Sequence, residues 1–223
     1  MTLTLYVAEP ASVPVIGASP PSWMCALLLA EKGLAHEVVP LSFSRGEHRS
    51  PAMLARNPRG TIPVLVDGDA VVHETFAILL YVEHLVPGHL PAARADRARA
   101  LTRFFEADAL KSAGMTALAY LMRTDERQRD PAVLATHGEA LRAELARWEA
   151  YLGVAGYVCG DQLTLADIAV FPYLAVLRQL GVSLAAFPLL AAYHDRVASR
   201  PAAVATQPPE RLPSARSPWD CLP

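Results

Sequence analysis

The stretch GTIPVL at residues 60–65 sets Pro63 among β-branched residues, at the head of a predicted strand. Proline has no backbone N–H to donate to a sheet ladder, so this residue belongs at an edge or a turn. If the Ile62–Pro63 peptide bond is cis, the N–H and C=O of Ile62 are held outward and free. The stretch therefore predicts a groove that pairs with an extended peptide. An ordinary trans turn proline is the alternative.

A predicted helix start follows after the Asp67-Gly68 turn. Glu74 and Thr75 open a helical stretch that extends to about Val86. The first turn of a helix presents backbone N–H groups and the positive end of the helix dipole, and both favour an anion. Together with the groove at Ile62, this helix start predicts a site for a small peptide that carries a carboxylate. A helix that merely favours an acid in its first turn is the alternative.

Residues 1–87 alternate between strand-like and helix-like patterns. Hydrophobic periodicity and turn residues predict strands at 3–7, 37–41, 63–66 and 70–72, and helices at 22–32, 51–56 and 74–86. This β-α-β-α-β-β-α order packs helices on both faces of a small mixed sheet.

The pattern changes near Pro87, and the chain beyond is rich in Ala, Leu and Arg without strand-like alternation. A helix is predicted at 95–122, either continuous or broken near Gly114. A second helix is indicated by apolar residues that share one helical face, among them Leu145 and Trp148. Two more are predicted from Leu165 onward and at 189–199. We expect an α+β protein with three parts: residues 1–87, an all-helical domain at 92–206, and an irregular, proline-rich tail at 207–223.

The helix expected from Leu165 has a complete start signal. Thr164 stands at the N-cap position and Asp167 at N3, so each side chain can bond the other's backbone amide. Leu163 and Ile168 occupy the positions of a hydrophobic staple. We expect a structural role here, the start of a buried helix.

Composition limits the possible partners. The chain has 223 residues, of which 52% are apolar and 19% charged, and its formal net charge is −2. It can bury a sizeable core and lacks the basic excess of a nucleic-acid-binding protein. Its apolar runs are too short or too interrupted to span a bilayer, and the N-terminus lacks the basic region of a secretory signal. We expect neither nucleic acid nor membrane as a partner.

The three cysteines, Cys25, Cys159 and Cys221, lie far apart and form no CxxC pair. No histidine stands at zinc-site spacing from them, so we expect no metal. Cys25 and Cys159 fall within apolar stretches and are predicted to be buried thiols. A reducing, cytoplasmic location fits this usage.

Two parts of the sequence together resemble the glutathione transferase superfamily, over nearly the whole chain. Residues 46–65 and 74–81 look like its glutathione-binding half, with Glu74-Thr75 where the family usually has Glu-Ser. Residues 160–169 resemble the signature of its helical half. The resemblance is to serine-type members, such as a bacterial protein of the zeta, theta or delta kind. It implies a thioredoxin-like domain, an all-α helical bundle, a homodimer, and glutathione as co-substrate.

The resemblance also implies roles for single residues. Thr75 would bind the γ-glutamyl carboxylate of glutathione through its backbone and hydroxyl, and Glu74 would hold the ammonium. The family's spacing between Pro63 and Glu74-Thr75 implies a cis Ile62–Pro63 bond, and the backbone around Ile62 would pair with the peptide. The residues implied for glutathione binding are His48, Arg59, Thr61, Ile62, Pro63, Glu74 and Thr75. For His48 and Arg59, which would contact the glycyl carboxylate, a solvated side chain is the alternative.

A conjugating enzyme needs a group that keeps glutathione as thiolate, because the thiol is a poor nucleophile. The stretch SPPSW at residues 19–23 looks like the family's Ser-x-x-Ser-Trp ahead of the first helix. On this resemblance Ser19 is the activating hydroxyl, and Ser22 is the second candidate. Ser19 also fits an ordinary helix N-cap, which is compatible with that role.

The second substrate would lie against the long helix that begins near Ala95. Phe104, Lys111 and Met115 are candidates to line its pocket, although helical aromatics and methionines often belong to a core. The loop at residues 8–18 is longer than in most family members, and our hypothesis is that it walls the same pocket.

The leading interpretation is an enzyme, a glutathione transferase that conjugates the glutathione thiolate to a hydrophobic electrophile, in detoxification or secondary metabolism. One alternative is a glutathione-dependent isomerase or dehalogenase similar to maleylacetoacetate isomerases. Another is a non-catalytic binding protein with the same fold. Fold alone does not choose among these functions.

Overall fold

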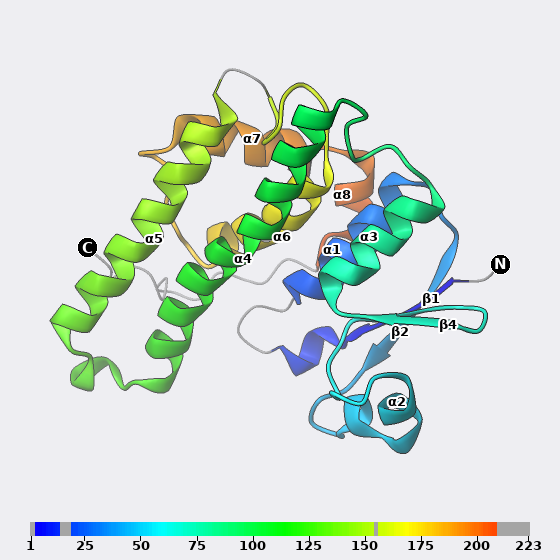
Figure 1. Ribbon diagram of the computed structural model, residues 1–223. Coiled ribbons are helices and arrows are strands. Elements are labelled where there is room, and N and C mark those ends of the chain that lie inside the picture. Colours follow the sequence, from blue (N-terminus) through cyan, green and yellow to red (C-terminus); the bar gives the residue numbers. More distant parts are fainter. Residues whose placement is uncertain (1–2, 14–18, 154–155, 209–223) are drawn as a thin grey trace. The chain divides into compact units, whose positions relative to one another are not determined.

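The computed structural model describes residues 3–13, 19–153 and 156–208. The chain divides into two compact units (Figure 1). One contains the residues up to His89 together with the described residues from Ser199 onward, and the other contains Leu90–Ala198. The first unit is built on a sheet and the second is all-helical, as the sequence predicted.

A four-stranded mixed sheet forms the centre of the first unit. Its strands are β1 (Leu3–Ala8), β2 (His36–Leu41), β3 (Val64–Asp67) and β4 (Ala70–His73), in the spatial order β2-β1-β3-β4. β1 pairs with β2 in parallel and with β3 antiparallel, and β3 and β4 form a hairpin. The predicted β-α-β-α-β-β-α order is confirmed.

Helices cover both faces of this sheet (Figure 1). On one face, Met53 of α2 (Pro51–Arg56) packs with Leu41 and Val64. α1 (Pro20–Glu31) and α3 (Thr75–Leu85) pack against each other and cover the other face. Consecutive residues of β3 are therefore both fully buried, because alternate side chains of a strand point to opposite faces.

The boundary between the units differs from the predicted one at the C-terminal end. Residues 199–206 were assigned to the helical domain, but α8 (Pro201–Thr206) packs on α1 of the first unit. Arg200 makes a bidentate ion pair with Glu31 at 2.6 and 2.7 Å, and Trp23 Nε1 donates to Thr206 Oγ1 at 3.2 Å. These contacts join residues far apart in sequence, so no local pattern could reveal them. The predicted tail at 207–223 lies outside the described residues from position 209 onward.

A buried ion pair fixes the end of α3 to the end of α1. Lys32, whose side chain is 1% exposed, donates from Nζ to Glu83 Oε2 at 2.6 Å and also to the Val86 carbonyl. Glu83 Oε1 in turn accepts the backbone N–H groups of Gly88 and His89, each at 2.9 Å. Burial opposes the charge on Glu83, but these donors outweigh it and lower the pKa of that carboxyl. The chain is thereby held where the first unit ends.

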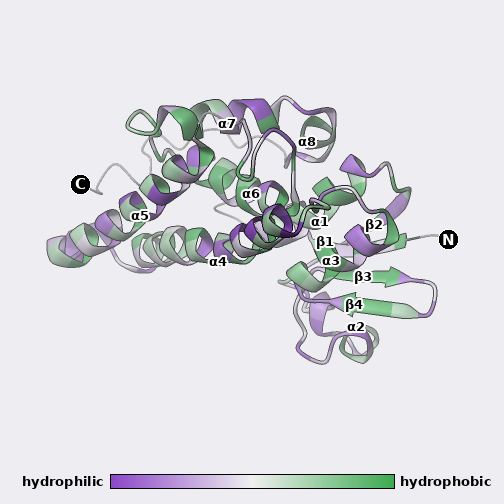
Figure 2. Cartoon of the chain, turned by 45° about the horizontal axis from the view of Figure 1, so that its top comes forward, coloured by the Kyte–Doolittle hydropathy of each residue, from purple (hydrophilic) through white to green (hydrophobic). Residues whose placement is uncertain are grey.

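Among the residues that the structure describes, the helical unit contains four long helices: α4 (Arg94–Arg123), α5 (Pro131–Leu152), α6 (Leu165–Gln179) and α7 (Pro188–Ala198). Hydrophilic and hydrophobic residues alternate along α5 and α7, as expected of helices with one solvated face (Figure 2). In α6, by contrast, every residue from Leu165 to Leu177 is buried. A helix that is apolar all round forms the centre of such a unit.

α4 is one unbroken helix of 30 residues, which decides between the two predicted forms. Gly114 does not break it. A β-carbon at Gly114 would lie 2.8 Å from Leu177 Cδ2, closer than such atoms approach in proteins. The glycine therefore permits close contact between α4 and α6.

The start of α6 has the predicted capping box. Asp167 is fully buried, and its carboxylate accepts the backbone N–H of Thr164 at 2.7 Å, the Thr164 hydroxyl at 2.9 Å and the Val158 N–H at 2.9 Å. Burial outweighs these bonds and raises the pKa of Asp167 to about 6.

Two further predictions can be compared with the structure. Cys25 is fully buried on α1, in agreement with a core role, whereas Cys159 is only partly buried. Within the described ranges, no helix combines the length and the apolar character needed to cross a membrane.

The raised pKa of Asp167 predicts a pH-dependent stability. Between pH of about 4 and about 6 the folded protein holds a proton on Asp167 that the unfolded chain releases, so the free energy of unfolding falls as pH rises through this window. Urea unfolding of the native protein and of Asp167→Asn, followed by circular dichroism at several pH values, measures this. The native protein should lose stability relative to the variant as pH rises, and a constant difference would contradict the prediction.

Candidate functional site

A cavity of about 530 Å³ lies where α3 begins. Its lining comes from the segment before β3, the start of α3 and one residue of α1: Pro21, Arg59, Thr61, Ile62, Pro63, Glu74 and Thr75. We call this the α3 cavity. Six of the seven residues were predicted as binding residues from the sequence. Pro21 was missed, because only the packing of α1 brings it there.

The β3–β4 hairpin brings the two predicted segments together. In its register Val64 pairs with His73, and this is the last pair at the open end of the hairpin. Pro63, just before Val64, and Glu74, just after His73, therefore lie next to each other. The short turn at Asp67-Gly68 thus brings together two segments that are separated in the sequence.

The Ile62–Pro63 peptide bond is cis, as predicted. The preceding loop is fixed by the buried side chain of Asn57, whose Nδ2 donates to the Thr61 carbonyl at 2.7 Å and to the Thr61 hydroxyl at 3.0 Å. Its Oδ1 accepts the N–H of Arg59 at 3.1 Å. Within the described residues, neither the N–H nor the C=O of Ile62 makes a hydrogen bond. The cavity therefore presents one backbone donor and one backbone acceptor.

Glu74 stands at the N-cap of α3 in an unusual backbone conformation. Its φ of 70° is positive, the only such value at a non-glycine position in the described part of the chain. Its side chain caps no backbone N–H, is 60% exposed and lies 3.7 Å from Arg59 Nε. A residue held in this region costs about 1–3 kcal/mol, and such residues concentrate at functional sites.

The predicted activator Ser19 is the N-cap of α1, and its Oγ accepts the Ser22 N–H at 3.5 Å. Ser22 is 6% exposed, and its Oγ accepts the Ala8 N–H at 3.5 Å. Both serines line a second cavity of about 470 Å³, which extends over Trp23 and α8 and which we call the α8 cavity. Neither serine lines the α3 cavity, which is reached by Pro21.

His48 is part of neither cavity lining. It lies in a short 3-10 turn, Glu47–Arg49, and its ring meets the Phe43 ring edge to face at a centroid distance of 4.7 Å. Its Nδ1 is buried and has no hydrogen-bond partner among the described residues.

The three residues expected to line the substrate pocket separate into two groups. Phe104 is fully buried, so it is a core residue and not a wall of an open pocket. Lys111 and Met115 line a cavity of about 580 Å³ between α4 and α5, which we call the α4–α5 cavity. The loop at 8–18 was expected to wall the same pocket. Residues 14–18 of this loop lie outside the described residues, so its role stays a prediction.

Comparison with known proteins agrees with this architecture. Residues 18–85 match the family model "Glutathione S-transferase, N-terminal domain", and residues 110–201 match "Glutathione S-transferase, C-terminal domain". The chain is 33% identical to glutathione S-transferase A of Pleuronectes platessa over 88% of this chain and 90% of that protein. The chain belongs to the glutathione S-transferase family of enzymes.

Two further relatives show the breadth of the match. Maleylacetoacetate isomerase of Pseudomonas aeruginosa is 33% identical over 81% of this chain and 88% of its own. The crystal structure of a glutathione S-transferase from the Antarctic clam Laternula elliptica superimposes with a TM-score of 0.88 at 30% identity, covering 99% of this chain and all of that one. These relatives establish the family. The serine-type class expected from the sequence stays a prediction.

The strained backbone at Glu74 predicts a stability difference between two variants. Glycine adopts a positive φ without a steric penalty, whereas the β-carbon of alanine retains that penalty. Glu74→Gly should therefore be more stable than Glu74→Ala by about 1 kcal/mol, measured as the difference in free energy of unfolding in urea. Equal stabilities, or a more stable alanine variant, would show that no strain is held at this residue.

Proposed function

We propose that the protein binds glutathione in the α3 cavity and transfers its thiolate to a hydrophobic electrophile. The observation that carries this proposal is the convergence around one cavity of the unpaired Ile62 backbone and the start of α3 at Glu74-Thr75. An extended backbone and an anionic end are the two features that such a cavity can bind.

Glutathione has both features. The N–H and C=O of its cysteinyl residue would pair with the C=O and N–H of Ile62, as in the addition of a strand. Its γ-glutamyl carboxylate would accept the N–H and hydroxyl of Thr75 at the positive end of α3. The exposed carboxylate of Glu74 is available for the ammonium, and Arg59 for the glycyl carboxylate. The role expected for His48 stays a prediction.

Ser19 is the better candidate for the thiolate donor. Each serine Oγ accepts a backbone N–H and so keeps its own proton to donate, but Ser19 is only partly buried whereas Ser22 is 6% exposed. Pro20 and Pro21 supply no backbone N–H at the helix start, so the hydroxyl would have to provide the hydrogen bond to the thiolate. Lowering a thiol pKa by two units needs about 2.7 kcal/mol, and a hydrogen bond to an ionised group can supply most of this. The thiolate sulfur then forms a bond to the electrophilic carbon.

A second candidate function is glutathione-dependent isomerisation, favoured by the relative that is a maleylacetoacetate isomerase. The two reactions differ in their product. Conjugation leaves glutathione bound to carbon, whereas isomerisation returns free glutathione, so mass spectrometry of the products separates them. A homodimer also remains a proposal, which sedimentation equilibrium would test.

Glutathione binding is tested by isothermal titration calorimetry. Glutathione should release or absorb heat on binding, and Glu74→Gln should weaken its binding by about tenfold or more, because a charge-assisted hydrogen bond is lost. The matched control is Glu37→Gln, an exposed glutamate on β2 outside the α3 cavity, which should bind as the native protein does. No heat with the native protein would refute the proposal.

The thiolate donor is tested by steady-state kinetics. Ser19→Ala should lower kcat with a hydrophobic electrophile by more than about tenfold while the Kd for glutathione changes little, because the hydroxyl contacts only the sulfur. The same variant should lose about 1 kcal/mol of stability through its lost N-cap. If Ser19→Ala keeps its rate and Ser22→Ala does not, the role belongs to Ser22.

A further inference from the structure

The α8 cavity lies wholly within the first unit. Its lining comes mainly from β1, α1, β2 and the end of α8, and every lining residue belongs to that unit. It shares no lining residue with the α3 cavity. Its volume of about 470 Å³ is in the range of small-molecule sites. The α8 cavity is therefore a second space of ligand size in this unit, beside the one proposed for glutathione.

One wall of the cavity is a strip of α1 that carries only small side chains. Between Met24 and Ala30 the helix is buried except at Ala26 and Ala30, which are partly exposed and line the cavity. The three leucines between these two alanines are fully buried. Residues four apart lie on one face of a helix, so the two methyl groups form one continuous wall. A larger side chain at either position would occupy the cavity.

A second wall is the edge strand β2. His36 and Val38 both line the cavity, and as alternate residues of a strand they point to the same face of the sheet. Val38 is 48% exposed, so much of its apolar surface is in contact with water. An apolar molecule in the cavity would cover Val38 together with the alanines of α1, and removal of apolar surface from water favours binding.

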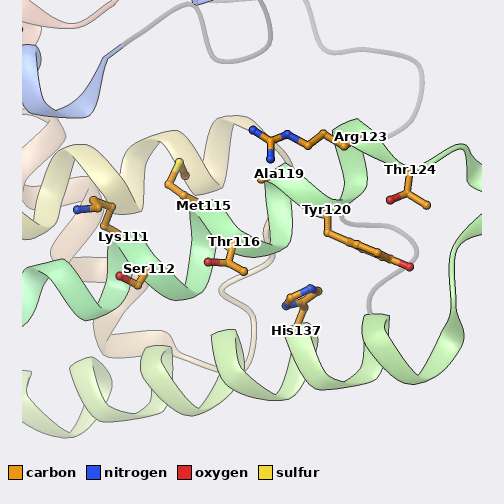
Figure 3. Close-up of a pocket in the computed structure, with 9 residues that line it drawn as sticks. All are labelled: Lys111, Ser112, Met115, Thr116, Ala119, Tyr120, Arg123, Thr124 and His137. Carbon is orange, nitrogen blue, oxygen red and sulfur yellow. The ribbon is translucent and has the colours of Figure 1, made fainter. Parts of the chain in front are cut away.

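The described lining of the α8 cavity contains no aspartate, glutamate, lysine or arginine. Two acidic residues adjoin it in sequence without supplying a charge: Glu31 is paired with Arg200, and Glu37 points to the face of β2 opposite to the lining residues. The α4–α5 cavity of the helical unit differs, because the side chains of Lys111 and Arg123 line it (Figure 3). A charged ligand in the α8 cavity would lose water without gaining a counter-charge, so this lining favours a neutral ligand.

A buried hydroxyl supplies a polar contact in the α8 cavity. Ser22 is 6% exposed and lines the cavity, and its Oγ accepts the Ala8 N–H at 3.5 Å. Among the described residues, its own proton is donated to no acceptor. A ligand oxygen that accepts this proton would satisfy a buried donor. Ser22 and Ala30 are eight residues apart, about 12 Å along the helix, so this oxygen belongs at one end of an elongated ligand.

We propose that the α8 cavity binds a neutral alkyl chain that carries a carbonyl group at one end. Ser22 would donate its hydroxyl proton to the carbonyl oxygen. The alkyl chain would lie along Ala26 and Ala30 and cover Val38. The inference concerns binding at a site separate from the α3 cavity, and it does not depend on the proposed function.

Isothermal titration calorimetry with 2-nonanone and with nonanoate, both in the absence of glutathione, tests the ligand class. The two probes are of similar length, but only nonanoate is charged. The titrations are made at a pH of about 8, where a carboxylic acid is ionised and imidazole is ordinarily neutral. The native protein should bind the ketone at least about tenfold more tightly, because the carboxylate would lose water without a counter-charge. Equal affinities, or a preference for nonanoate, overturn the neutral class.

Substitutions in the lining test the position of the ligand. Ala26→Leu and Ala30→Leu each place a larger side chain in the cavity, and each should weaken binding of the ketone by more than about tenfold. Ala55→Leu is the matched control, because Ala55 is an exposed alanine of α2 outside the lining, and it should bind as the native protein does. Ser22→Ala should weaken binding by about twofold to tenfold, the size of one neutral hydrogen bond. Thermal melts monitored by circular dichroism verify that all variants are folded.

The indole N–H signals of two tryptophans report where the ketone binds. Trp23 lines the α8 cavity, whereas Trp148 is fully buried in the helical unit. In nitrogen–proton correlation spectra, assigned with Trp23→Phe, the ketone should shift the Trp23 signal and leave the Trp148 signal in place. No binding by the native protein, binding unchanged in both leucine variants, or a shift of Trp148 alone overturns the site. Binding unchanged in Ser22→Ala overturns the carbonyl contact.

Discussion

The pairing of Val64 with His73 at the open end of the β3–β4 hairpin is the constraint on which the α3 cavity depends. It sets Pro63 beside Glu74, and so brings a segment with an unpaired backbone next to the start of a helix. Strand pairing of this kind is rigid, since a slip of one residue would turn every side chain to the opposite face. Both faces of β3 are buried, so the register is fixed by the core as well as by the turn.

Around this hairpin, the fold keeps polar groups available at the cavity instead of satisfying them internally. Asn57 uses its amide to hold the loop through Thr61 and Arg59, and Ile62 retains its backbone groups. Glu74 adopts a positive φ and leaves the first turn of α3 without a side-chain cap. A helix start without its own cap is a weaker structural element but a better anion site.

In the helical unit, by contrast, the polar groups at a helix start are satisfied internally. Asp167 satisfies three donors at the start of α6, and α6 then forms the buried centre of the unit. Gly114 permits α4 to approach Leu177 of this helix closely. With one side of α4 fixed in this way, other residues of the helix line the α4–α5 cavity.

The sequence by itself determined the features that depend on neighbouring residues. The helix start at Glu74-Thr75, the capping box at Asp167 and the order of strands and helices follow from local geometry and periodicity, whereas the cis bond before Pro63 was expected from the resemblance to the family. Only the tertiary structure decided that α8 belongs to the first unit, that Phe104 is core while Lys111 and Met115 line a cavity, and that Ser19 and Pro21 line different cavities. The physical reason is that these outcomes depend on which surfaces are buried between segments distant in the chain, and side-chain packing at that range leaves no periodic signal in the sequence.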